Sequence, residues 1–119
     1  MKTILAIDDQ ASVLQTLRWL VEANGYRCVT AATAEEAEMV FRENAVDVVI
    51  VDHGLPGIDG SRLALYLKKI KPVPVIMLSG NPDLKPPSGA VDVFLAKPQN
   101  PSDLLRAIGK MVAHEDREN

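Results

Sequence analysis

The sequence predicts an α/β domain with a five-stranded parallel sheet and helices on both faces. Short apolar runs, typical of buried strands, alternate with longer stretches whose apolar residues recur every three or four positions, as in helices. Its 119 residues fit a single domain, residues 1–119. The strand order 2-1-3-4-5 is the common solution for a sheet of this size.

Three strands are predicted in the first half of the chain, at residues 4–7, 26–31 and 46–51. The third is almost wholly β-branched. The first intervening helix carries an apolar stripe made of Val13, Leu14, Leu17, Leu20 and Val21. Asn24-Gly25 suits its C-terminal end. Thr33 and Glu36 form a capping box that opens the second helix.

In the second half, Asp59 is a good N-cap for a helix that Pro72 ends. Strands are predicted at residues 73–78 and 91–96, and a last helix begins near Pro101. The polar residues 115–119 are expected to form a frayed tail.

One crossover differs from the others. Between Ser79 and Val91 the chain contains Pro82, Pro86 and Pro87, and this segment is near the minimum length for a crossover between parallel strands. The fourth helix is therefore expected to be short, irregular or missing.

Composition narrows the functional classes. The formal charge of −3 and the absence of a basic stripe give no reason to expect nucleic-acid binding. The single Cys28 forms no internal disulfide, which suits a reducing compartment. No apolar run approaches the roughly 20 residues that cross a bilayer. We expect a cytoplasmic protein without direct membrane contact.

Acidic residues follow two strands that are expected to be neighbours in the sheet. Asp8 and Asp9 come directly after the first strand, and Asp52 ends the third. The carboxyl ends of these strands meet where the strand order reverses, which is where ligands bind in such sheets. Ser79 and Lys97, at the ends of the fourth and fifth strands, are expected at the same edge.

Three close carboxylates repel one another, so positive charge must offset them. Lys97 supplies one charge, and a divalent cation would supply two more. Oxygen ligands suit Mg²⁺, whereas the His and Cys cluster that zinc prefers is missing from the sequence. A carboxylate beside Mg²⁺, a hydroxyl group and an ammonium group is equipped to accept a phosphoryl group, giving an acyl phosphate on Asp52.

Over essentially its whole length, the sequence resembles the receiver domain of bacterial response regulators, of the stand-alone, chemotaxis-regulator-like kind. Four motifs carry the resemblance, each at the end of a predicted strand. They are Asp8-Asp9, the run from Asp52 to Gly60, Ser79-Gly80 and Lys97-Pro98. The resemblance implies a flavodoxin-like fold and a two-component phosphorelay function.

The resemblance also implies roles for individual residues. Asp52 is the expected phosphoacceptor. Asp9 and Asp52 are expected to bind Mg²⁺ through their carboxylates, Gly54 through its backbone carbonyl, and Asp8 mainly through water. Ser79 and Lys97 are expected to contact the phosphoryl group.

Further positions concern the conformational switch and the framework. Ser79 and Phe94 match the switch positions. The expected structural residues are Pro56, Asp59, Gly60 and Pro98, the last in a cis peptide bond with Lys97.

The expected partner is a histidine kinase or a histidine phosphotransfer protein, together with an unknown output protein. In similar proteins the face made by the fourth helix, the fifth strand and the fifth helix often forms the dimer or output contact. Because prolines remove much of the fourth helix here, we expect a monomer or a weak dimer. The resemblance implies a domain that catalyses its own phosphorylation and turns over no metabolite, so it is not expected to be a conventional enzyme.

Three other functions are compatible with parts of the sequence. The first is a receiver-like protein-binding module that is not phosphorylated. A flavin or nucleotide carrier needs a Gly- or Ser/Thr-rich phosphate loop after the first strand, where Asp8-Asp9-Gln10 stands instead. A phosphatase with an aspartyl nucleophile usually has a second acid two positions further on, where this chain has Gly54.

Overall fold

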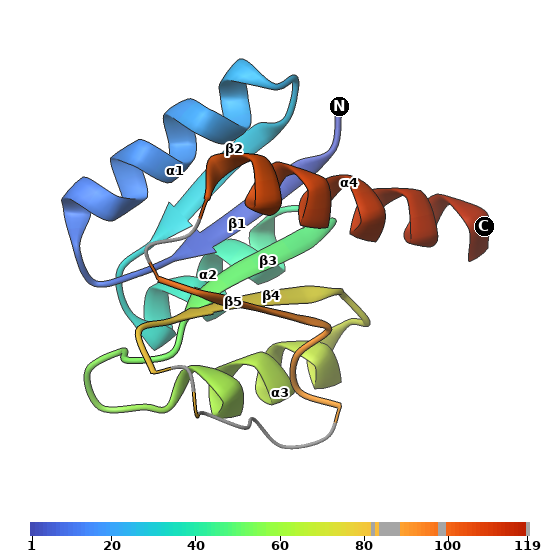
Figure 1. Cartoon of the computed structure of the whole chain (residues 1–119). Helices are drawn as coiled ribbons and strands as arrows, with labels where there is room; N and C mark the ends of the chain where they lie inside the picture. Colours follow the sequence, from blue (N-terminus) through green and yellow to red (C-terminus); the bar gives the residue numbers. More distant parts are fainter. Residues whose placement is uncertain (82, 84–88, 98–99, 119) are drawn as a thin grey trace.

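A computed structural model describes residues 1–81, 83, 89–97 and 100–118, without the side chains of residues 114–118. Within these ranges there are five strands and four helices, which alternate along the chain except that β5 follows β4 directly (Figure 1). In chain order they are β1 (Thr3–Ile7), α1 (Ala11–Ala23), β2 (Arg27–Ala31), α2 (Ala34–Glu43), β3 (Val48–Asp52), α3 (Gly60–Ile70), β4 (Val75–Ser79), β5 (Val93–Ala96) and α4 (Pro101–Glu118).

All five strands are parallel and lie in the order β2-β1-β3-β4-β5, which confirms the predicted sheet. The order reverses between β1 and β3, where Ile7 pairs with Val51. On the other side of β3, Asp52 pairs with Leu78 of β4. The carboxyl ends of the central strands therefore lie side by side.

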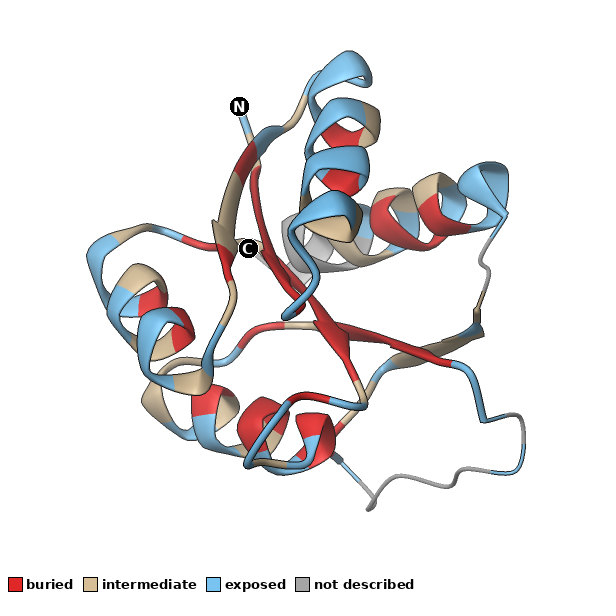
Figure 2. Cartoon of the chain, turned by 90° about the vertical axis from the view of Figure 1, so that its left-hand side faces the viewer, coloured by how far each residue is buried: buried red, intermediate tan, exposed pale blue. Residues whose placement is uncertain are grey.

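Alternate residues of the strands supply two apolar layers, because successive side chains on a strand point to opposite faces. Leu5, Ile7, Val49 and Val51 pack with residues of α2 and α3. Ile4, Ala6, Val48 and Ile50 pack with residues of α1 and α4. Figure 2 shows burial concentrated on the strands and on the helix faces that meet them.

The predicted helix ends are confirmed. The amide of Glu36 donates to Thr33 Oγ1 at 3.1 Å, as in the predicted capping box. The Glu36 carboxylate accepts from the amide of Ala32 at 2.9 Å, one residue before the N-cap amide that a capping box uses. Asp59 caps α3 by accepting from the amide and the hydroxyl of Ser61, at 2.8 and 2.7 Å. Gly25 follows α1 with a φ of 88°, which a glycine adopts without strain.

The crossover from β4 to β5 has no helix in its described residues, as the prolines predicted. Residues 82 and 84–88 lie outside the described residues. The helix labelled α4 is therefore the one that follows β5. It continues to Glu118, so the backbone is helical over residues 115–118. The fraying of the tail stays a prediction. No helix among the described residues is long and apolar enough to cross a bilayer.

Candidate functional site

Three carboxylates meet where the sequence placed them, at the carboxyl ends of β1 and β3. Asp8, Asp9 and Asp52 each offer one oxygen atom, and these atoms lie within 4.8 Å of one another. Asp8 and Asp52 are buried, whereas Asp9 is exposed. Two of the three carboxylates that could bind a metal ion are therefore buried, and the third is exposed to solvent.

Lys97, directly after β5, reaches across to this cluster. Its Nζ atom donates to Asp52 Oδ1 at 2.8 Å and to Asp8 Oδ2 at 3.4 Å. A hydrogen bond from the Lys97 amide to the carbonyl of Ser79, at 2.7 Å, fixes the backbone from which this side chain extends. Because one ammonium group faces three carboxylates, the cluster keeps an excess of negative charge.

Burial and neighbouring charges act on the ionisation of two of these groups. Burial raises the pKa of Asp8, and the charge of Asp52 raises it further, against the opposing effects of the Gln10 amide and Lys97. Burial alone would lower the pKa of Lys97. Its hydrogen bond to Asp52 and the charges of both buried carboxylates outweigh that effect and raise it. Lys97 is therefore a firmly protonated counter-ion.

The donor set fits Mg²⁺. All three side chains present carboxylate oxygens, the ligands that hard divalent cations prefer, and their negative charge exceeds what Lys97 neutralises. A divalent cation would remove the remaining repulsion. Magnesium is thus the cofactor that the chemistry of this pocket supports.

Ser79 ends β4 and is buried. Its Oγ accepts a hydrogen bond from the amide of Asn81 at 3.0 Å. That bond occupies an acceptor position and leaves the hydroxyl proton available for a phosphoryl oxygen.

Phe94 is half-buried on β5 and packs against the apolar layer that contains α2 and α3. Its role as a switch stays a prediction.

His53 follows the phosphoacceptor candidate but belongs to different surroundings. Its Nε2 lies 4.0 Å from Asp59 Oδ1, the carboxylate that caps α3. This position agrees with the prediction that successive residues at the end of a strand point to opposite sides. Among the described residues, the group of side chains that could hold a metal ion does not include His53.

Gly60, one of the expected structural residues, lies against the backbone of the candidate phosphoacceptor. A Cβ atom at this position would clash with the backbone carbonyl of Asp52 and lie 3.0 Å from His53 Cα. The start of α3 therefore packs directly on the backbone of the candidate phosphoacceptor. No feature of the sequence marks this contact, because a glycine can follow an N-cap whether or not another backbone segment lies close to it.

A backbone amide also contacts the acidic cluster, and sequence reasoning missed it. The amide of Gln10 donates to Asp8 Oδ1 at 2.9 Å. Since every residue except proline has an amide, no residue type marks such a donor.

Gly54 and Pro56 lie exposed in the loop between β3 and α3. Pro98, and with it the predicted cis bond, lies outside the described residues.

Comparisons with known proteins agree on one family. The model of the response regulator receiver domain matches residues 4–109. Response regulator GtcR of Aneurinibacillus migulanus is 34% identical over 111 residues, which cover 90% of this chain and 46% of that protein. The phosphate regulon transcriptional regulatory protein PhoB of Pseudomonas aeruginosa is 33% identical over 111 residues, or 87% of this chain and 48% of that protein. The chain thus spans about half the length of these curated relatives.

Solved structures give the same result. A response regulator receiver domain protein from Clostridium thermocellum superposes with a TM-score of 0.93 at 32% identity, covering 100% of both chains. Response regulator TrrA from Thermotoga maritima, solved in complex with Mg(2+)-BeF, has a TM-score of 0.83 at 32% identity. That match covers 93% of this chain and 99% of the other.

Proposed function

Because the chain belongs to the response regulator receiver domain family and is thus a phosphoacceptor signalling domain of two-component systems, we propose that Asp52 is its phosphoacceptor. One observation supports this residue above its neighbours. Asp52 shares the acidic cluster with Asp8 and Asp9, and the ammonium group of Lys97 lies closer to Asp52 Oδ1, at 2.8 Å, than to Asp8 Oδ2, at 3.4 Å. Asp52 therefore belongs to a set of carboxylates that can bind a metal ion. Its paired Lys97 ammonium group can move to an oxygen of the phosphoryl group after transfer.

In the proposed reaction, a carboxylate oxygen of Asp52 attacks the phosphorus atom of a phosphohistidine. The new O–P bond forms as the N–P bond breaks, and the electron pair of that bond stays on the imidazole nitrogen of the donor. Lys97 shifts from the carboxylate to a phosphoryl oxygen, where its positive charge offsets the charge that develops. Hydrolysis of the acyl phosphate then restores Asp52.

The acidic cluster also has a preparatory role. We propose that Asp9, Asp52 and the carbonyl of Gly54 hold Mg²⁺ directly and that Asp8 acts through bound water. When bound, Mg²⁺ supplies positive charge to the phosphoryl oxygens. The exposed position of Asp9 supports this proposal, because it leaves one side of the cluster accessible to ions from solvent.

Phosphorylation is proposed to act through Ser79 and Phe94. The added phosphoryl oxygens accept a hydrogen bond from the Ser79 hydroxyl, and the end of β4 shifts toward Asp52. Since Met77 of β4 pairs with Phe94 of β5, a shift of β4 changes the space around this aromatic ring. The phosphoryl group then biases an equilibrium between two packings that already exist.

Receiver domains exchange phosphoryl groups with histidine kinases or phosphotransfer proteins, and we propose one of these as the donor for this chain. We further propose a cytoplasmic setting, a monomer or weak dimer, and an output made through protein contacts. The domain catalyses only its own phosphorylation and dephosphorylation, so we do not class it as a conventional enzyme. The proposed domain extends over residues 1–119.

Acetyl phosphate provides the direct test. With Mg²⁺ present, the intact mass of the protein should increase by one phosphoryl group. Asp52→Asn should abolish the increase, whereas Asp83→Asn, a matched change at an exposed position, should leave it unchanged. Labelling that persists in Asp52→Asn would contradict the assignment. An absence of labelling from every donor would favour a binding module that is not phosphorylated.

A further inference from the structure

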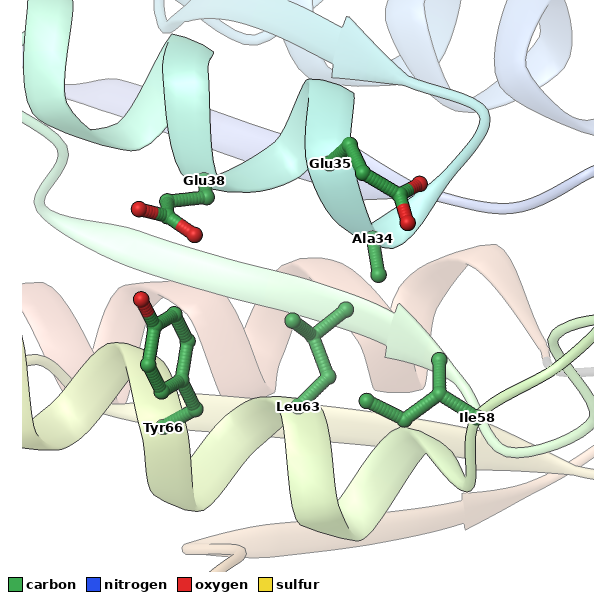
Figure 3. Close-up of a pocket in the computed structure, with 6 residues that line it drawn as sticks. All are labelled: Ala34, Glu35, Glu38, Ile58, Leu63 and Tyr66. Atoms are coloured by element: carbon green, nitrogen blue, oxygen red, sulfur yellow. The ribbon is translucent and has the colours of Figure 1, made fainter.

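A groove between α2 and α3 lies apart from the acidic cluster (Figure 3). It encloses about 260 Å³. Its lining residues come from α2, from α3 and from the loop that precedes α3. They are Ala34, Glu35, Glu38, Ile58, Leu63 and Tyr66. None of them belongs to the phosphoacceptor site.

The groove has an apolar floor and an acidic rim. Ile58 and Leu63 face Ala34 across it, while the carboxylates of Glu35 and Glu38 project from α2 (Figure 3). Leu63 is buried, and Ile58 is half-buried. A side chain entering here would place carbon atoms on the floor and a polar end beside the two carboxylates.

The charge on the rim is negative. The lining residues include two carboxylates and no lysine or arginine. Glu38 pairs with Arg42 at 3.0 Å, and hydrogen bonding by Arg42 and Tyr66 lowers the pKa of Glu38, so it is ionised at neutral pH. The side chain of Glu35 is exposed and makes no hydrogen bond or ion pair within the described residues. At least one carboxylate is thus available to a cation from outside.

Exposed apolar side chains border the same helices. Tyr66 on α3 is 43% exposed, and Met39 on α2 is 52% exposed. Met39 follows Glu35 by four residues, a spacing that puts both on one face of a helix. Half of the large apolar side chains exposed in the described part of the chain are therefore on these two helices; the others are Met1 and Trp19.

The size and charge of the groove restrict what it can hold. Its volume is below the roughly 300–1,000 Å³ typical of small-molecule sites, and its carboxylates repel phosphates. An arginine or lysine side chain fits better, because it combines an apolar stem with a cationic end. Amphipathic helical segments of partner proteins commonly dock in apolar grooves through side chains spaced about one turn apart.

We propose that the groove between α2 and α3 binds a helical segment of a partner protein that inserts an arginine or lysine side chain. Its stem packs on Ile58 and Leu63, and its charged end pairs with Glu35 and Glu38. Tyr66 and Met39 cover the neighbouring apolar residues of that segment. Binding does not require a phosphoryl group on Asp52, so the surface is separate from the proposed phosphoacceptor function.

The test uses the whole unphosphorylated chain, labelled with ¹⁵N, and two synthetic helical peptides of about 14 residues. One peptide carries leucines and arginines one turn apart, and the other has glutamine in place of arginine. The arginine peptide should shift the amide resonances of residues 34–38 and 58–66 at concentrations up to about 1 mM. The glutamine peptide should bind about fivefold more weakly, because two exposed ion pairs are lost.

Variants separate the groove from general surface charge. The double variant Glu35→Gln/Glu38→Gln should weaken binding of the arginine peptide about fivefold, whereas Glu43→Gln on the same helix should leave it unchanged. Circular dichroism melting checks that each variant is folded. Three outcomes would overturn the proposal: no shifts, shifts centred elsewhere, or a double variant that binds as tightly as the unaltered chain. Each is independent of whether Asp52 accepts phosphate.

Discussion

Asp8→Asn should stabilise the metal-free protein while removing its response to Mg²⁺. Asp8 is buried with Asp52, and one oxygen of each carboxylate in the cluster lies within 4.8 Å of the others. At an effective dielectric constant of about 20, each such repulsion costs about 3.5 kcal/mol, and the attraction of Lys97 at 3.4 Å returns about 5 kcal/mol. Two repulsions therefore exceed the attraction by about 2 kcal/mol, before the cost of burying the charge.

Asparagine removes the charge but keeps a carbonyl oxygen for the Gln10 amide. Because its NH₂ group cannot accept from Lys97, part of the gain is lost. We expect a net increase of about 1–2 kcal/mol in the free energy of unfolding. Urea unfolding followed by far-UV circular dichroism in EDTA measures it. Trp19 fluorescence is a poorer probe, since this side chain is already 64% exposed.

Repeating the urea unfolding with Mg²⁺ in place of EDTA measures how much of the stabilisation by Mg²⁺ the substitution removes. At ten times its dissociation constant, the ion should stabilise the unaltered chain by about 1.4 kcal/mol and Asp8→Asn by far less. Asp9→Asn is the matched control. Its exposed carboxylate should give a smaller gain in EDTA but a similar loss of the Mg²⁺ effect. An Asp8→Asn protein that is less stable than the unaltered chain in EDTA would refute the reasoning.

The pH dependence of the free energy of unfolding follows from the burial of Asp8. The pKa of Asp8 is raised in the folded state, so the folded protein binds this proton more tightly than the unfolded chain. The destabilising effect of Asp8 is therefore absent below its ordinary pKa and develops as pH rises through the raised value. Asp8→Asn should remove this part of the pH profile. An unchanged profile in EDTA would count against a strained, buried carboxylate.

Three further substitutions test other parts of the account. Lys97→Gln should slow labelling by acetyl phosphate at least about tenfold, because a transition-state charge loses its partner, while Mg²⁺ affinity stays equal or rises; a parallel loss of both would contradict the assigned role. Gly60→Ala should lower the free energy of unfolding by about 1–3 kcal/mol, since a Cβ atom there clashes with the Asp52 carbonyl, and a neutral result in urea unfolding would show that α3 can move away. Thr33→Ala should cost about 1 kcal/mol through the lost cap of α2, whereas Thr16→Ala, whose hydroxyl bonds only within α1, should cost less in the same assay.

The fold was predictable because its local signals agree with its topology. Thr33 and Asp59 cap helices as their positions implied, and the apolar runs became strands of a sheet whose order the alternation of elements favoured. The meeting of Asp8, Asp52 and Lys97 was also predictable, because residues at the carboxyl ends of parallel strands share one edge.

Other features depend on distances that no residue type encodes. The close approach of Gly60 to Asp52 depends on where α3 begins relative to the end of β3. The amide of Gln10 bonds Asp8 through a group common to most residues. The groove beside Tyr66 results from the spacing between α2 and α3. The sequence pattern of each helix predicts that helix but not its distance from the other.

Chemical mapping of the acceptor tests the central claim most directly. After treatment with acetyl phosphate and Mg²⁺, borohydride reduces an aspartyl phosphate to homoserine, which tandem mass spectrometry locates within the tryptic peptide of residues 43–62. Homoserine is expected at position 52 only, and none is expected when Mg²⁺ is removed. Homoserine at position 8, 9 or 59, or conversion at position 52 that is independent of Mg²⁺, would contradict the claim.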